Sequence, residues 1–270
     1  MTATPVVTLL TDYGTGSEFP GICHGVIRRI CRDAAIVDIT HAIARHDVRQ
    51  GALVLRNALP FMPVGVHVAV VDPQVGTERR AVAVRCADER VLVGPDNGLL
   101  SLAWEQAGGA AEAVDVSRSP HRLEPISATF HGRDVFAPVG AALAGGAPFA
   151  GAGDPLDAGD LVGLELPRPR RVGDVVIAHV LLVDVYGNVT LDVRHEDLPT
   201  SGLVYGRRLE VSVGGRSRQA TFTGTFADVA HGEVLVYEDS TRLLALAVNR
   251  GSAADTFELE PDAEVRLTPL

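Results

Sequence analysis

The chain has 270 residues, which is long enough for one large domain or two ordinary ones with a well-formed core. Hydrophobic residues make up 46% and charged residues 21%, a balance typical of a globular protein rather than a disordered one. The formal net charge of −10 argues against a nucleic acid or an anionic membrane as the main partner, because both require a basic surface.

The basic residues exclude several cofactor classes. All 24 are arginine, and without lysine the chain cannot form a pyridoxal phosphate Schiff base or use a Walker A or kinase-type phosphate lysine. The three cysteines, Cys23, Cys31 and Cys86, lack CxxC spacing, so we expect reduced thiols in a cytoplasmic protein rather than disulfides or a zinc cluster. We find no signal-peptide pattern and no apolar window of about 18 residues, so no membrane span is predicted.

The first half of the chain alternates strand and helix patterns. The apolar run at 6–11 predicts a buried strand that ends in the turn Asp12–Gly14, and the spacing of apolar residues at 21–32 predicts a helix. The further expected elements are a strand at 36–39, a helix at 48–59 with Asp47 as its N-cap, strands at 66–71 and 81–85, a turn at 94–98 and a helix at 132–143. This alternation predicts an α/β domain over residues 1–165 with a largely parallel central sheet.

The second half has a different composition. Residues 144–172 are dense in Gly, Pro and Asp, and the stretch from Pro167 to Arg171 is typical of a linker. Short β-type runs follow at 175–185, 189–193, 208–213, 219–222, 233–237 and 243–248. Their spacing predicts a small β-barrel or sandwich over residues 173–270.

Asp12 directly follows the first expected strand. Ligands of open α/β sheets bind beyond the carboxyl ends of the strands, where a carboxylate can accept hydrogen bonds from a ribose 2′,3′-diol. A turn-forming Asp before glycine is an equally good interpretation of this residue alone. The glycines 14, 16 and 21 are misspaced for a GxGxxG dinucleotide motif, which we reject.

The segment VVDPQVGTERR carries a second acid at a strand end. A loop shaped by Pro73 and Gly76 separates Asp72 from Arg79 and can turn the two side chains toward each other. The neighbouring guanidinium should keep the carboxylate ionised, so that it orients a water but acts as a weak base. A structural Asp–Arg clamp is the alternative interpretation.

His131, in ATFHGRDVF, lies just ahead of an expected helix. Histidine titrates near neutrality and could take or guide a proton that Asp72 cannot, and a helix N-terminus favours an incipient hydroxide. A capping or core histidine is the alternative. The other eight histidines show no HxH or HExxH grouping, so no metal site is predicted.

In the second half, VDVYGNV places Asp184, Tyr186 and Asn188 at a strand end. These supply an acid for an ammonium group, an aromatic face for a base and an amide for an adenine edge, and Phe226 could supply a second aromatic face. An ordinary hairpin turn at Gly187 is the alternative.

Taken together, these stretches resemble the S-adenosyl-L-methionine hydroxide adenosyltransferases, the hydrolase branch of the family that includes the fluorinase and the chlorinase. The resemblance runs from Val6 to about Ala254. The motifs that carry it are TDYG, VDITHAIARHDVRQGALVLRNALP, VVDPQVGTERR, VGPDNGLL, ATFHGRDVFAPV, DVYGNV and LALAVNRGSA. Motifs of this length in family order are far more specific than any single residue.

The resemblance implies an N-terminal α/β domain, a C-terminal β-barrel and a homotrimer with sites between subunits. It implies that Asp12 binds the ribose and that Asp72, Arg79 and His131 are catalytic. The implied adenine contacts are Tyr186, Phe226 and Asn188, and the implied methionine contacts are Asp184 and Ser240. Ser240 is the poorest match, because DSTRLL departs from the family pattern.

The resemblance also indicates the reaction. Halogenating relatives carry Tyr where this chain has Asp72, and fluorinases carry Ser at Gly132 and a long insertion within 80–94. The expected activity is therefore hydrolysis of S-adenosyl-L-methionine to adenosine and L-methionine by direct displacement, with no cofactor or metal and no covalent intermediate. The alternatives are a chlorinase-like halide adenosyltransferase and a non-catalytic sensor of adenosine or S-adenosylmethionine.

Overall fold

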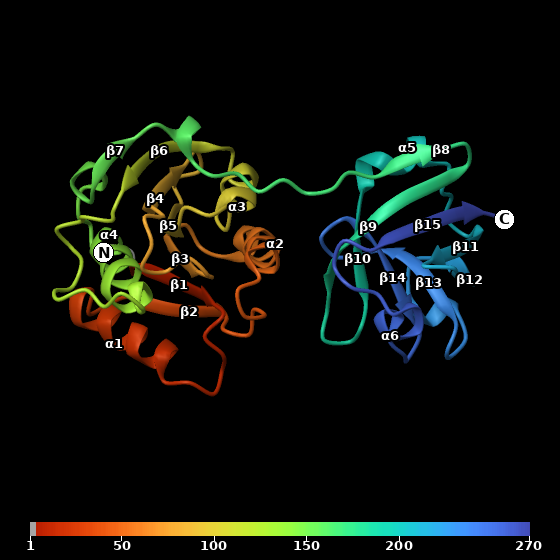
Figure 1. Ribbon diagram of the computed structural model, residues 1–270, viewed down its shortest axis with the longest axis horizontal. Coiled ribbons are helices and arrows are strands. Elements are labelled where there is room, and N and C mark those ends of the chain that lie inside the picture. The colour runs from red at the N-terminus through yellow and green to blue at the C-terminus, as the bar shows by residue number, and fades with distance from the viewer. Residues whose placement is uncertain (1–3) are drawn as a thin grey trace. The chain divides into compact units, whose positions relative to one another are not determined.

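The computed structural model describes residues 4–270. These fall into two compact units that divide between Leu164 and Glu165, and each is described by itself (Figure 1). Within the described residues, no helix is long and apolar enough to cross a membrane.

The first unit contains a seven-stranded sheet with the order β2-β1-β3-β5-β4-β6-β7. The strands are β1 Val6–Thr11, β2 Ala35–Thr40, β3 Val66–Val70, β4 Ala81–Cys86, β5 Val91–Pro95, β6 Ala110–Asp115 and β7 Asp154–Leu156. The four strands β2, β1, β3 and β5 run parallel, whereas β4 is antiparallel to β5 and to β6. The prediction of an α/β domain with a largely parallel sheet is confirmed.

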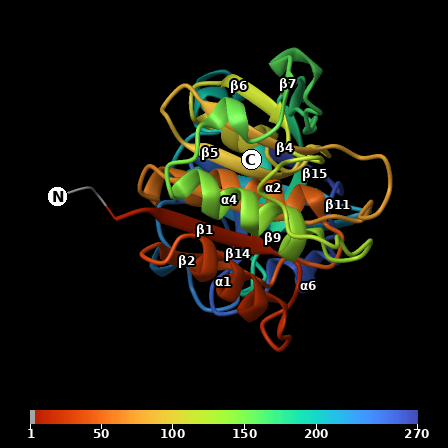
Figure 2. The same ribbon diagram turned by 90° about the vertical axis from the view of Figure 1, so that its left-hand side faces the viewer.

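Helices cover both faces of this sheet (Figure 2). Helix α1 (Phe19–Ile30) and α4 (Ala137–Ala144) share one hydrophobic cluster with the sheet, and α2 (Val48–Ala58) and α3 (Ser101–Gln106) share the other. Burial on both faces explains why β3, with the sequence VHVAV, is buried at every position. Asp47 caps α2 as predicted, since its carboxylate accepts a hydrogen bond from the Gln50 backbone N–H at 2.8 Å.

Two local predictions in this unit were imprecise, and four elements were not predicted. The helix expected at 132–143 begins as a π-helical turn over Gly132–Phe136 before α4. The turn expected at 94–98 starts later, because Gly94 and Pro95 are the last residues of β5. Strands β5, β6 and β7 and helix α3 were not predicted, because short apolar runs of this kind do not distinguish strand from helix by period alone.

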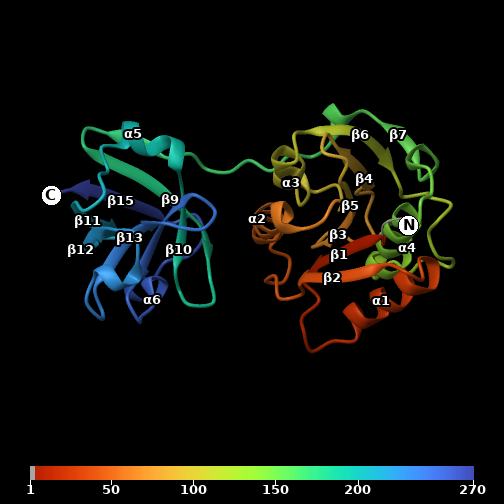
Figure 3. The ribbon, with the colours of Figure 1, turned by 180° about the vertical axis from the view of Figure 1, so that it is seen from behind.

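The second unit is a closed seven-stranded barrel (Figure 3). Its strands are β9 Val175–Val183, β10 Val189–Arg194, β11 Arg208–Val213, β12 Arg216–Phe222, β13 Val234–Glu238, β14 Leu243–Val248 and β15 Glu264–Pro269. Pairing of β10 with both β14 and β9 closes the ring. This closure confirms a barrel over a sandwich, and alternate residues such as Leu209, Val211 and Val213 on β11 face inward.

Closure depends on a strand that was not predicted. Strand β15 fills the gap between β11 and β9, and its run EVRLTP alternates polar and apolar residues, a strand signal that sequence reasoning missed. The short strand β8 (Arg170–Val172) pairs with β9, so Arg170 and Arg171 belong to a strand and not to the predicted linker. The short helices α5 (Leu198–Ser201) and α6 (Ala253–Phe257) complete this unit.

Candidate active site

Asp12 and Asp72 follow neighbouring parallel strands at the same edge of the first sheet. Strands β1 and β3 pair in a register that sets Thr11 opposite Val70, so both acids lie just beyond the carboxyl ends. The His46 backbone N–H donates a hydrogen bond to Asp12 Oδ2 at 2.9 Å and fixes that side chain. The topology therefore places both predicted acids where open α/β sheets bind ligands.

The loop between Asp72 and Arg79 brings their side chains into contact. Arg79 Nε donates to Asp72 Oδ1 at 3.0 Å and Arg79 Nη2 donates to Asp72 Oδ2, a bidentate pair whose side chains are 4% and 5% exposed. Gly76 is required in this loop, because its φ is +81° and an added Cβ would lie 2.6 Å from the Ala128 carbonyl oxygen. Buried bidentate pairing holds the carboxylate in one orientation.

His131 joins this pair through the same guanidinium. Arg79 Nη2 lies 3.1 Å from His131 Nδ1, and because arginine can only donate, Nδ1 accepts and the neutral ring carries its proton on Nε2. Burial, and then the charge of Arg79, lower the pKa of His131 below its usual value. At neutral pH the ring is therefore neutral and offers its Nε2–H as a donor, which favours guiding a proton over accepting one.

A cavity of about 160 Å³ lies beside Arg79 and His131. Its lining includes Thr77, Ser117 and Ile126. At ~30 Å³ per water, this volume corresponds to roughly five water molecules. The cavity can hold water against Arg79 and His131, whereas Asp72 is not among its lining residues. It is smaller than the about 300–1,000 Å³ of a pocket for a drug-sized ligand.

Tyr13 is a neighbour of this set that sequence reasoning did not single out, although it stands beside Asp12 in TDYG. Its ring packs edge-on against Phe19 and Phe130, with centroids 5.9 Å and 5.7 Å away. Burial, and the nearby charges of Cys23, Asp12 and Asp72, raise the pKa of Tyr13 well above its usual value. The phenol is therefore neutral and lies next to both acids.

Tyr13 also explains the glycine that follows His131. A Cβ at Gly132 would lie 2.0 Å from Tyr13 Oη and 3.0 Å from Tyr13 Cζ. Gly132→Ala is expected to lower the free energy of unfolding by about 1–3 kcal/mol, because the packed Tyr13 ring cannot move without disturbing its aromatic neighbours. Denaturant unfolding measures the loss, and adding Tyr13→Phe should recover part of it by removing the clashing oxygen.

The matched control is Gly25→Ala. Gly25 lies inside α1, and an added Cβ meets nothing within 4 Å, so this change should stabilise the protein by up to about 1 kcal/mol. Equal changes in the free energy of unfolding for Gly132→Ala and Gly25→Ala would disprove the close contact between position 132 and Tyr13.

The second unit brings together the polar residues predicted from DVYGNV. Asp184 follows β9 and accepts hydrogen bonds from the backbone N–H groups of Tyr186 and Asn188 at 2.8 and 2.9 Å. Asn188 Nδ2 also donates to Asp184 at 2.8 Å, which leaves its Oδ1 as an acceptor. The hairpin turn of the alternative interpretation is present, with Gly187 at φ +78°, and it positions these side chains.

The predicted aromatic residues of this unit are accessible. Tyr186 is 76% exposed and Phe226 is 39% exposed, and the Phe226 ring lies 5.1 Å from that of Tyr237. Burial, and then Asp239 and Asp184, raise the pKa of Tyr237 to about 12. The rings of Tyr186 and Phe226 are therefore accessible to a ligand.

Ser240 is exposed in the turn between β13 and β14, directly after Asp239. Asp239 accepts hydrogen bonds from Thr190 Oγ1 at 3.2 Å and from Thr241 Oγ1 at 2.7 Å. Asp239 therefore orders the turn, a role that sequence reasoning missed.

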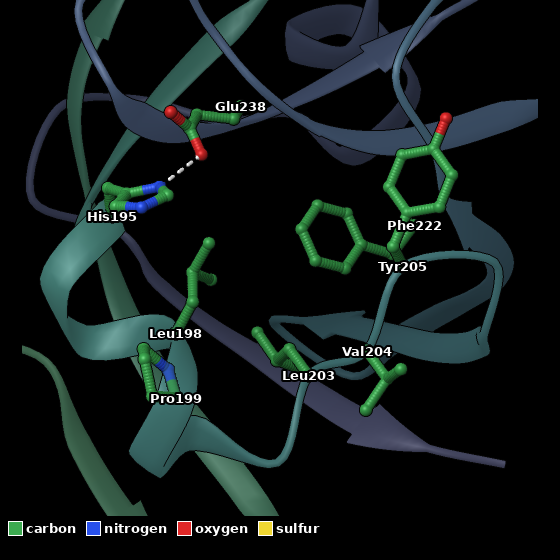
Figure 4. Close-up of a pocket in the computed structure, with 8 residues that line it drawn as sticks. All are labelled: His195, Leu198, Pro199, Leu203, Val204, Tyr205, Phe222 and Glu238. Carbon is green, nitrogen blue, oxygen red and sulfur yellow. Dashed lines mark hydrogen bonds and ion pairs between the residues drawn. The ribbon is translucent and has the colours of Figure 1, made fainter.

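A separate pocket of about 370 Å³ on the barrel contains none of the predicted residues (Figure 4). Apolar side chains, including Leu198, Leu203 and Phe222, line it, and His195 and Glu238 form an ion pair at 2.7 Å on its rim. It lacks the paired acids that distinguish the edge of the first sheet.

The fold and the buried Asp–Arg–His set define a two-domain α/β and β-barrel enzyme with its polar cluster at the carboxyl edge of the sheet. The described residues match the models of the SAM hydroxide adenosyltransferase N-terminal domain over 7–153 and C-terminal domain over 178–266. The chain belongs to the SAM hydroxide adenosyltransferase family, which confirms the resemblance.

Individual relatives agree with this assignment. The chain is 44% identical over 268 residues, 99% of each chain, to the (R)-S-adenosyl-L-methionine hydrolase of Salinispora tropica. It is 36% identical to the hydrolase of the same name from Thermus thermophilus, over 97% of this chain and 98% of that one. The fluorinase of Actinopolyspora mzabensis is more distant, at 28% identity over 98% and 97% of the two chains.

A solved structure shares the whole fold. An uncharacterized conserved protein from Thermotoga maritima superposes with a TM-score of 0.90 at 34% identity, covering 97% of this chain and 99% of that chain.

Proposed function

We propose that this enzyme hydrolyses S-adenosyl-L-methionine to adenosine and L-methionine. The observation that carries the proposal is the buried, bidentate Asp72–Arg79 pair with His131, at the same sheet edge as Asp12. The names of its hydrolase relatives support the same reaction.

The reaction is an in-line displacement at C5′ of the ribose. The water oxygen forms a bond to C5′ as the C5′–sulfur bond breaks, and the electron pair of that bond returns to the sulfur of methionine. Because the sulfonium is already a good leaving group, the protein has mainly to position a water and exclude bulk solvent. This mechanism requires no cofactor, no catalytic metal and no covalent intermediate.

Each of the three side chains has a separate role toward that water. Asp72 accepts a hydrogen bond from it and then one of its protons, since the protonated alcohol first formed at C5′ is strongly acidic and becomes the neutral alcohol when it loses that proton. A carboxylate held by arginine is basic enough for this late transfer. Arg79 holds the carboxylate, and the Nε2–H of His131 donates to the water oxygen and orients its lone pair.

The remaining predicted residues bind the substrate. Asp12 accepts from the ribose diol. Tyr186 and Phe226 flank the adenine, and the free Oδ1 of Asn188 accepts from its amino group. Asp184 and Ser240 contact the methionine moiety, where the carboxylate complements the ammonium group.

One incubation separates this function from its alternatives. Purified enzyme is incubated with S-adenosyl-L-methionine, with and without chloride, and the products are separated by chromatography. Adenosine and methionine in both reactions support hydrolysis. Chlorodeoxyadenosine would show a halide adenosyltransferase, and an unchanged substrate that binds would show a sensor.

Asp12→Ala is expected to weaken adenosine binding by roughly 1.5–3 kcal/mol, because the ribose loses its charged acceptor. Calorimetry with adenosine measures this change. Asp33→Ala, an exposed acid of the same unit, is the control and should leave affinity unchanged. Equal affinity of Asp12→Ala and wild-type enzyme would refute the placement of the ribose.

The enzyme is proposed to be a cytoplasmic homotrimer in which one subunit's barrel completes the site of a neighbour. The cavity beside His131, at about 160 Å³, is small for a nucleoside-sized ligand, while Tyr186 and Phe226 are exposed on the barrel. A cyclic trimer with head-to-tail contacts would supply each half from a different chain.

Complementation tests the shared site. Asp72→Asn and Asn188→Ala subunits are unfolded, mixed in equal amounts and refolded together. Every mixed cyclic trimer then has one site with neither lesion, and random mixing should restore roughly one quarter of wild-type activity. Each variant refolded alone is the control. No recovery, with mixed trimers verified by mass spectrometry, would place both halves of the site in one chain.

A further inference from the structure

Three potential metal ligands meet at the edge of the first sheet, outside the proposed catalytic set. His24 comes from α1, Asp38 from the edge strand β2, and His41 from the segment that follows β2. One ligand atom from each lies within 4.8 Å of the others. The three residues do not have HxH or HExxH spacing, which explains why no histidine motif indicated them.

The carboxylate of Asp38 lies between the two rings. His24 Nε2 is 2.8 Å from Asp38 Oδ1, and His41 Nε2 is 3.1 Å from the same oxygen. Both imidazole nitrogens therefore face one carboxylate oxygen.

His41 supplies the observation that points to a ligand. Its side chain is only 9% exposed, and Nδ1 hydrogen-bonds to Thr11 Oγ1 at 2.9 Å. Nε2 is buried and, although close to Asp38, is not aligned for a hydrogen bond. A buried imidazole nitrogen without a hydrogen bond is costly unless something else satisfies it.

We propose that His24 Nε2, the Asp38 carboxylate and His41 Nε2 bind a divalent transition-metal ion of the zinc class, with water in the remaining position. Two imidazoles and one carboxylate suit Zn²⁺ and its neighbours, whereas Mg²⁺ and Ca²⁺ prefer all-oxygen sites. Thr11 would accept from the Nδ1–H of His41 and direct the Nε2 lone pair to the ion.

The proposed site is open to solvent on one side, so a bound ion could exchange with the solution. The side chains of His24 and Asp38 are 36% and 42% exposed, so an ion can enter from that side while His41 closes the other. The ion would join α1, the edge strand and the following segment. That segment also touches the loop of Asp12, since the His41 carbonyl accepts from Gly14 N–H at 2.8 Å. A bound ion would therefore stabilise this region.

Cobalt and zinc titrations of the tag-free, full-length protein test the proposal. Co²⁺ should produce visible absorption bands that saturate at one equivalent per chain, and Zn²⁺ should displace them. Because loss of an outer-shell partner alone typically costs about 10–100-fold in affinity, His24→Gln and Asp38→Asn should each weaken binding by at least about 100-fold. Zn²⁺ should raise the Tm of the wild type and not of these variants.

The matched control is His195→Gln, which removes the histidine of another His–carboxylate pair, His195–Glu238, at 2.7 Å compared with 2.8 Å for His24–Asp38. It should bind Co²⁺ as the wild type does. The two variants alter a half-buried and an exposed side chain, respectively, and circular dichroism verifies their folding. The proposed site would be overturned if the wild-type protein bound Co²⁺ no more tightly than His24→Gln and Asp38→Asn do.

Discussion

Replacement of Asp72 by asparagine is expected to lower kcat by about 10²–10⁴-fold, because the amide cannot receive the proton that the attacking water releases. Affinity for adenosine should change far less, since those contacts are assigned in our proposal to Asp12 and the barrel residues. Steady-state kinetics with S-adenosyl-L-methionine and calorimetry with adenosine measure the two effects separately.

This substitution also leaves the buried guanidinium of Arg79 without its counter-charge, which typically costs about 3–5 kcal/mol of stability. The assay must therefore run well below the Tm of the variant. Asp88→Asn is the matched control, because it removes a second Asp–Arg pair, with Arg90, from the same unit. Turnover near the wild-type value in Asp72→Asn would eliminate Asp72 as the proton acceptor.

His131→Ala is likewise expected to lower kcat by about 10²–10⁴-fold, because the attacking water loses the donor that orients it. Because Arg79 places the ring proton of His131 on Nε2, a glutamine substitution can distinguish a hydrogen-bond donor from a base. Glutamine at this position also offers an N–H group but cannot act as a base at neutral pH. If His131 is a donor, His131→Gln should recover at least about tenfold over His131→Ala.

The pH profile gives an independent measurement of the same role. Protonation of His131 places N–H groups of two cations face to face and breaks the contact with Arg79. Because burial and Arg79 lower the pKa of His131, the active neutral form persists below pH 6.5, and kcat falls only as the pH drops through that lowered value. His131→Gln should lack this acid limb. A glutamine variant as inactive as alanine, with the limb unchanged, would show that His131 acts as a base or that another group titrates.

The fold class and the family were predictable from sequence because their evidence is local. The buried strand at Val6–Thr11, the N-cap at Asp47 and the motifs around Asp72 and His131 each depend on a few neighbouring residues. Asp72 and Arg79 are only seven positions apart, so a short loop sufficed to predict their contact. The barrel followed from the regular spacing of short β-type runs, although Glu264–Pro269 was missed.

Tertiary structure alone decided the features that join distant segments. Strand β15 closes the barrel only because β11 and β9 leave room for it, and Gly132 must be glycine only because Tyr13 packs there from another loop. The tautomer of His131 depends on a guanidinium 52 positions away. The sequence by itself determined which residues carry charge and how each segment folds locally, whereas packing of the sheet decided which polar atoms face one another, because burial makes each unpaired group costly.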